Sequence, residues 1–130
     1  METPRKRAVI WVAVSSERQT TPDKVSLEYQ EQVARAWCEK NGYDVVEVLA
    51  VKGHSRSDPH LTRLLKKYRA KGVLAYDRLQ ELWEAKGFDV LVAYSSDRLG
   101  RSGTLIHWVI ETTYYEGMQV CLTEGGGLMD

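Results

Sequence analysis

The stretch Ala8-Val9-Ile10-Trp11-Val12-Ala13-Val14-Ser15-Ser16 organises the rest of the chain. An apolar run rich in β-branched residues stops abruptly at two serines, which is the pattern of a short buried strand. Ser15 is then expected at the carboxyl end of that strand. In an open α/β sheet, ligands bind at this edge, and a hydroxyl there can act as a nucleophile when a neighbouring group activates it. The plainer interpretation is that both serines only end the strand and begin a turn.

Length and charge favour a single domain without a general affinity for polyanions. The chain has 130 residues, with 18 basic and 18 acidic side chains. Because these charges balance, any anion-binding site must come from a local cluster. The sequence shows no signal peptide and no apolar run of membrane length, so a cytoplasmic protein without a membrane partner is expected.

The cysteines and histidines do not suggest a metal centre. Cys38 and Cys121 lie far apart, each within an apolar pattern, and are expected to be buried free thiols rather than a disulfide. His54, His60 and His107 show no ligand spacing. No metal site is therefore expected.

Strand and helix patterns alternate along the chain. Apolar periodicity, capping residues and glycines predict helices over residues 27–41, 59–72, a segment ending at Gly87, and 105–116. Further strands are expected over residues 43–51, 88–94 and 118–122, and residues 124–127 are expected to be flexible. This order predicts an α/β fold with a mostly parallel central sheet and helices on both of its faces.

A second polar stretch, Asp97-Arg98-Leu99-Gly100-Arg101, follows the third expected strand. Because the carboxyl ends of parallel strands share one edge, Ser15 is expected to lie near Arg98 and Arg101. Two guanidinium groups can converge on one anion, and Asp97 can orient one of them through a bidentate bond. A serine facing fixed arginines suits phosphoryl transfer. The plainer interpretation of Asp97 and Arg98 is a surface ion pair.

The sequence gives less support to an acyl-transfer triad or to a P-loop that binds a nucleoside triphosphate. No histidine has a telling spacing to Ser15, and there is no glycine-rich loop ending in Lys-Ser or Lys-Thr. A small α/β domain that binds a phosphate or a nucleotide remains an alternative, and it requires a pocket at the same sheet edge.

Several motifs occur in a fixed order over nearly the whole chain. They are an aromatic residue that leads into Val14-Ser15 and is followed by Gln19, the helix start Ser26-Leu27-Glu28-Tyr29-Gln30, Ser55, and Asp97-Arg98-Leu99-Gly100-Arg101-Ser102. In order and spacing they resemble the catalytic domain of the serine site-specific recombinases, the resolvase and invertase family. The likeness is greatest to the branch of large serine integrases and transposases. It implies a resolvase-like fold and a role in DNA recombination, integration or transposition.

The resemblance also implies a mechanism. Ser15 would attack a DNA phosphate, form a 5′-phosphoserine link and release a 3′ hydroxyl. Arg98 and Arg101 would hold and neutralise that phosphate, and Asp97 would position an arginine or help the leaving group. Gln19 would support the phosphate or the nucleophile loop. Because the bond energy would be kept in the phosphoserine, the resemblance implies that no cofactor, neither a nucleotide nor a metal, is needed.

Further expectations concern Ser55, partners and domains. Ser55 would contribute to substrate binding. DNA would be the substrate, and the full-length protein would act as a homodimer or homotetramer. Residues 1–130 would form a single resolvase-like catalytic domain, without the long dimerisation helix and the DNA-binding domains of the family.

The chain departs from the family at two arginines. Ala13 stands where the family has an arginine beside the nucleophile. The family arginine of the helix before the third strand falls near residues 73–75, where none stands, and Arg69 or Arg78 could replace it. These departures leave an alternative, a catalytically weakened or inactive recombinase-like module used for assembly or regulation.

Overall fold

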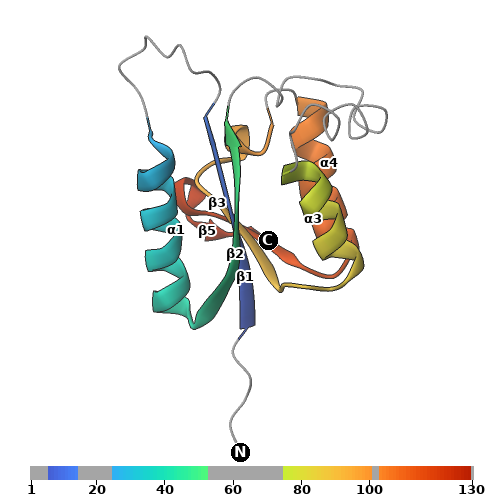
Figure 1. Cartoon of the computed structure of the whole chain (residues 1–130), viewed down its shortest axis with the longest axis horizontal. Coiled ribbons are helices and arrows are strands. Elements are labelled where there is room, and N and C mark those ends of the chain that lie inside the picture. Colours follow the sequence, from blue (N-terminus) through green and yellow to red (C-terminus); the bar gives the residue numbers. More distant parts are fainter. Residues whose placement is uncertain (1–5, 15–24, 53–74, 101–102, 130) are drawn as a thin grey trace, which may run out of the picture.

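One five-stranded sheet forms the centre of the molecule (Figure 1). The computed structural model describes residues 6–14, 25–52, 75–100 and 103–129. The strands lie in the order β2-β1-β3-β4-β5. Their bounds are β1 Lys6–Val14, β2 Tyr43–Lys52, β3 Val90–Ala93, β4 Gln119–Leu122 and β5 Gly127–Leu128. β1 runs parallel to β2 and β3, and β3 runs parallel to β4, whereas β5 is antiparallel to β4.

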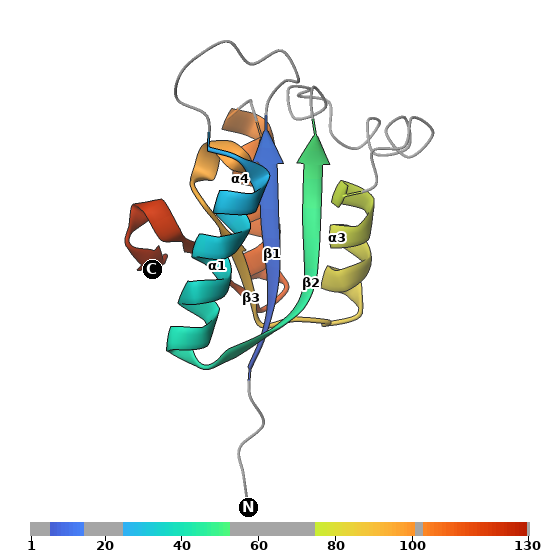
Figure 2. The same cartoon turned by 60° about the vertical axis from the view of Figure 1, so that its left-hand side comes forward.

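Helices cover both faces of the sheet. α1 (Leu27–Asn41) lies on one face, and α3 (Ala75–Glu84) and α4 (Gly103–Tyr115) lie together on the other (Figures 1 and 2). The short helices η2 (Ser96–Arg98) and η3 (Thr123–Gly125) follow β3 and β4. The mostly parallel α/β fold expected from the sequence is confirmed. None of the helices in the described ranges is long and apolar enough to cross a membrane.

β1 is apolar from Ala8 to Val14, because both of its faces are buried from Ala8 to Ala13. Val9, Trp11 and Ala13 belong to the core cluster between the sheet and α3 and α4. The intervening residues Ala8, Ile10 and Val12 belong to the cluster beneath α1. A strand in the middle of a parallel sheet therefore shows a continuous apolar run instead of alternation.

The ends of α1 follow from its sequence. The Ser26 hydroxyl accepts a hydrogen bond from the backbone N–H of Tyr29 at 3.0 Å, as an N-cap does. Gly42 has a φ of +81° and closes the helix in the left-handed conformation that glycine adopts at low cost. Both expected boundaries are confirmed.

The last residues differ from the sequence prediction. Residues 124–127 were expected to be flexible, but this segment forms η3 and leads into β5. Gly126 and Gly127 have φ values of +98° and +109°, so the glycines allow the turn that returns the chain to the sheet edge. The backbone N–H of Met129 then donates to the carbonyl of Val120 at 2.9 Å. Glycines interpreted as a sign of flexibility instead build a tight turn.

Some element boundaries also differ. β3 and β4 are shorter than the expected strands at 88–94 and 118–122, and α4 is described from Gly103 rather than from residue 105. Residues 79, 82 and 83 of α3 are buried as expected. The helix expected at 59–72 lies outside the described residues.

The two cysteines are buried free thiols, as expected. Both belong to the cluster beneath α1. Burial raises the pKa of Cys38 to about 11 and that of Cys121 to about 12. Because the thiolate is the reactive form, neither side chain is nucleophilic near neutral pH.

We expect neither thiol to react with iodoacetamide at pH 8 while the protein is folded, and both to react after unfolding in urea. Intact-mass spectrometry with and without urea measures this. The raised pKa values also predict the direction in which stability changes with pH. The contribution of the two neutral thiols to the free energy of unfolding is complete below the ordinary thiol pKa. It is lost as the pH rises through the pKa values of the folded protein, so stability should fall above about pH 9. Rapid alkylation of the folded protein would contradict the described burial.

Candidate active site

The carboxyl ends of β1 and β3 meet at one edge of the sheet. Trp11 pairs with Ala93, the last residue of β3, and β1 continues from there to Val14. The guanidinium Nη1 of Arg98, in the helix that follows β3, donates to the carbonyl of Ala13 at 3.3 Å. The sequence prediction that these two strand ends share an edge is therefore confirmed. Since β2 and β3 flank β1 on opposite sides, this edge is also the switch point of the sheet, where α/β folds bind ligands.

The described residues include only part of the expected site. Asp97 and Arg98 are described, and Val14 is the last described residue before Ser15. The other expected site residues lie outside the described ranges: Ser15, Gln19, Ser55 and Arg101. The roles of all these residues remain predictions.

Arg98 is held on several sides. Its Cζ lies 5.9 Å from the centre of the Tyr94 ring, within the range of a cation–π contact. The Tyr94 hydroxyl donates to Glu124 Oε2 at 2.9 Å, which fixes the ring and raises the pKa of this hydroxyl. Arg98 Nε is buried and has no hydrogen-bond partner within the described part of the chain. The guanidinium is thus a constrained cation at the strand end that leads to Ser15.

Asp97 lies beside Arg98 in η2, and its side chain is exposed. The Ser95 hydroxyl donates to Asp97 Oδ1, so a neighbouring side chain orients this carboxylate. That contact was not anticipated from the sequence. The expectation that Asp97 positions an arginine stays a prediction.

Gln30 fixes the end of β1 from the side of α1. Its side chain is 1% exposed, and its Oε1 accepts from the Ala13 N–H at 3.0 Å. Its Nε2 donates to the carbonyls of Ala13 and Val25, both at 2.9 Å. The side-chain amide therefore continues the hydrogen bonding of the sheet at the last residues of β1 before Ser15. Gln30 belongs to the helix-start motif in the sequence, but no role was predicted for it there. The available signal was a polar residue at the spacing of the buried Ala34 and Cys38.

Ala13 is completely buried in the cluster with Trp11. Arg78, one of the two candidates for the family arginine of the helix before the third strand, is bound away from the end of β1. Its guanidinium binds Glu47 through two hydrogen bonds of 2.8 Å and lowers the pKa of that carboxylate. Glu47 pairs with Val9, and at about 3.3 Å per residue this is roughly 16 Å back from the end of β1. Arg69, the other candidate, lies outside the described residues.

Gly100 is needed because Leu105 occupies the space beside it. A Cβ at residue 100 would lie 2.6 Å from Leu105 Cγ and 2.9 Å from its Cβ. Leu105 is itself completely buried, so it has little room to move. A larger residue than glycine at the end of the Asp-Arg-Leu-Gly sequence would therefore overlap with the Leu105 side chain.

We expect Gly100→Ala to lower the free energy of unfolding by about 1–3 kcal/mol, as overpacking of a core does. Urea denaturation measures it. Gly103→Ala is the control, because a Cβ there meets nothing within 4 Å. Equal stability of the two variants would contradict the close packing against Leu105.

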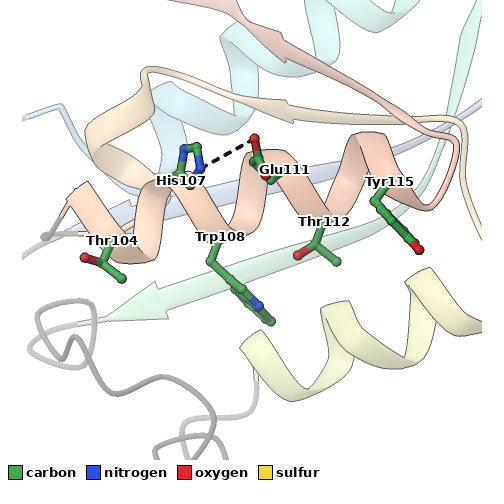
Figure 3. A pocket seen from close by; sticks show the side chains of 6 residues that line it. All are labelled: Thr104, His107, Trp108, Glu111, Thr112 and Tyr115. Carbon is green, nitrogen blue, oxygen red and sulfur yellow. Dashed lines mark ion pairs between the residues drawn. The ribbon is translucent and has the colours of Figure 1, made fainter.

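A hollow of about 400 Å³ lies along the outer face of α4 (Figure 3). His107 Nε2 lies 3.5 Å from Glu111 Oε2 on one side of it, and Trp108 extends toward α3. There the Trp108 ring contacts Trp83 edge-on, with 5.1 Å between ring centres. Of the expected site residues, the two that the structure describes, Asp97 and Arg98, do not line this hollow.

Comparisons with known proteins agree with the fold and with the family resemblance. The family model described as "Resolvase, N terminal domain" matches residues 8–128. A search of curated proteins found no match. Among solved structures, the C-terminal catalytic domain of ISC1926 TnpA, an IS607-like serine recombinase, is similar at 27% identity and a TM-score of 0.67. That match covers 90% of this chain and 70% of the other.

Two further structures share the fold at lower identity. The N-terminal catalytic domain of TP901-1 integrase has a TM-score of 0.73 at 21% identity, covering 92% of this chain and 79% of the other. A resolvase family site-specific recombinase from Streptococcus pneumoniae has a TM-score of 0.70 at 17% identity, covering 95% of this chain and 76% of the other. The chain therefore belongs to the resolvase family of serine recombinases and has the fold of their catalytic domain.

Proposed function

We propose that this chain is the catalytic domain of a DNA recombinase that cleaves and rejoins DNA through a 5′-phosphoserine intermediate. The observation that carries the proposal is the bond from Arg98 Nη1 to the carbonyl of Ala13. It brings a constrained cation to the strand end two residues before Ser15. A nucleophile and a cation at one switch point are what phosphoryl transfer requires.

In the proposed reaction, Ser15 Oγ attacks the phosphorus of a DNA phosphodiester. A bond forms between Oγ and phosphorus, and the bond from phosphorus to the 3′ oxygen breaks. The serine proton passes to solvent, and the departing 3′ oxygen takes up one proton from solvent, so the number of protons is unchanged. Rejoining reverses these steps with the 3′ hydroxyl of another strand. The ester bond is conserved in the phosphoserine, so the cycle needs no nucleotide.

Each remaining site residue has a proposed role. Arg98 and Arg101 neutralise the charge of the attacked phosphate, and Asp97 orients an arginine or assists the leaving oxygen. Gln19 supports the phosphate or the loop of the nucleophile, and Ser55 contributes to substrate binding. All 130 residues would act as one catalytic domain, in a protein that functions on DNA as a dimer or tetramer.

The test is covalent capture of DNA. The full-length protein is incubated with a library of randomised duplex DNA and denatured in detergent, and electrophoresis then reveals protein that carries labelled DNA. We expect an adduct with the wild type and with Ser16→Ala, and none with Ser15→Ala. An adduct that persists in Ser15→Ala, at equal folded fraction, would overturn the assignment of the nucleophile.

Ala13 favours a second candidate function, an inactive recombinase-like module for assembly or regulation. Loss of one donor to a developing charge can slow a reaction by about 10²–10³-fold. The same capture experiment separates the two functions. Folded wild type and folded Ala13→Arg that both fail to form an adduct would favour the inactive module, whereas an adduct with the wild type would exclude it.

A further inference from the structure

Two consecutive carbonyls after β3 are each held by a buried aromatic side chain. The Tyr76 hydroxyl, in the first turn of α3, donates to the carbonyl of Leu99 at 2.9 Å. The indole Nε1 of Trp11, in β1, donates to the carbonyl of Arg98 at 2.8 Å. Tyr76 and Trp11 are both completely buried. The backbone that carries Arg98 is thus fixed from two different elements.

The two aromatic rings also support each other. Their centres lie 4.9 Å apart at an interplanar angle of 56°. Aromatic side chains have few rotatable bonds, so a packed pair holds its polar ends in place at a small cost in entropy. Because Trp11 belongs to the strand that leads to Ser15, this pair fixes the spacing between the two halves of the proposed site.

The position of Arg98 depends on this backbone more than on regular secondary structure. η2 is only three residues long, and none of them is buried. Leu99, which follows it, is completely buried, so its carbonyl cannot easily exchange the Tyr76 hydroxyl for water. A shift of the turn would move the guanidinium away from the Ala13 carbonyl and from the Tyr94 ring.

We propose that Tyr76 is a positioning residue, whose hydroxyl holds the turn after β3 so that Arg98 faces the end of β1. The link to DNA cleavage rests on the proposed function, whereas the placement of Arg98 does not. The Tyr76 hydroxyl acts on Arg98 through the Leu99 carbonyl and is not proposed to touch the substrate.

The test compares Tyr76→Phe with Tyr114→Phe. Each variant loses one hydroxyl that donates to a backbone carbonyl at 2.9 Å, but the Tyr114 hydroxyl bonds Met129. The readout is the Arg98 Nε–H resonance of the free protein and its rate of exchange with solvent. Because Arg98 Nε is buried, a displaced turn exposes it. We expect a shifted resonance and at least about fivefold faster exchange in Tyr76→Phe only. An unchanged resonance, or an equal change in Tyr114→Phe, would overturn the proposal.

A second readout is the rate of adduct formation with DNA. Tyr76→Phe should slow the cleavage step about tenfold or more, because a small misplacement of a catalytic group is costly, while affinity for DNA stays the same. Tyr76→4-aminophenylalanine keeps a donor at this place and should restore both the rate and the Arg98 resonance. If the wild type forms no adduct, the proposed function fails, and the resonance experiment still decides the role of Tyr76.

Discussion

Arg98→Ala is expected to slow DNA cleavage by about 10²–10³-fold, the loss seen when one donor to a developing negative charge is removed. Its guanidinium is the described cation that reaches the strand end before Ser15. Arg98→Lys should recover little of this loss, because an ammonium lacks the planar fork that bonds Ala13 and faces the Tyr94 ring. The measurement is the rate of adduct formation at saturating DNA.

Arg78→Ala is the matched control for this prediction. Arg78 is also an arginine with fixed partners, but those partners are Glu47 and Glu81, away from the carboxyl end of β1. Exposed ion pairs contribute up to about 1 kcal/mol to stability, so this variant should fold and cleave DNA at nearly the wild-type rate. Cleavage by Arg98→Ala within about threefold of the wild type would contradict the role of Arg98 in charge neutralisation.

Gln30→Ala is expected to lower the free energy of unfolding by about 3–5 kcal/mol. The variant removes the partner of the Ala13 N–H and of the Val25 carbonyl, and one of the partners of the Ala13 carbonyl. Each buried group left without a partner costs about 1–3 kcal/mol, and a small cavity adds to that loss. Urea denaturation followed by circular dichroism measures the change.

Gln32→Ala is the control for Gln30, because it makes the same substitution at an exposed position of the same helix. It should change the stability by less than about 0.5 kcal/mol. Gln30→Glu gives a further check. A carboxylate can accept from Ala13 but cannot donate to the two carbonyls, so this variant should gain stability as the pH falls and the acid becomes protonated. A Gln30→Ala variant as stable as Gln32→Ala would show that the bonds to Ala13 contribute nothing.

Much of the fold could be predicted from local patterns. The apolar run ending at Val14 indicated a strand buried on both faces, and Ser26 and Gly42 marked the ends of α1 correctly. These signals are local, because a cap or a buried strand is defined by residues close in sequence. The meeting of the ends of β1 and β3 followed from the parallel order of strands alone.

The supports of the site could not be predicted in the same way. The bonds that Gln30 donates to Ala13, Trp11 to Arg98 and Tyr76 to Leu99 join residues 17 to 87 positions apart. All three side chains donate to backbone carbonyls. Because every residue has a backbone carbonyl, the residue type does not reveal which one accepts such a bond. β5 was missed for a related reason, since two residues held by main-chain bonds carry no pattern of side chains.

The most direct measurement of the central claim is the mass of the peptide that stays attached to DNA. After the adduct forms, trypsin releases residues 8–18, bounded by Arg7 and Arg18. Fragmentation then identifies the modified residue. The account predicts that Ser15 carries a 5′-phosphate-linked nucleotide and that the opposite cut end has a free 3′ hydroxyl. A nucleotide on Ser16 or outside this peptide, or a link through a 3′ phosphate, would contradict it.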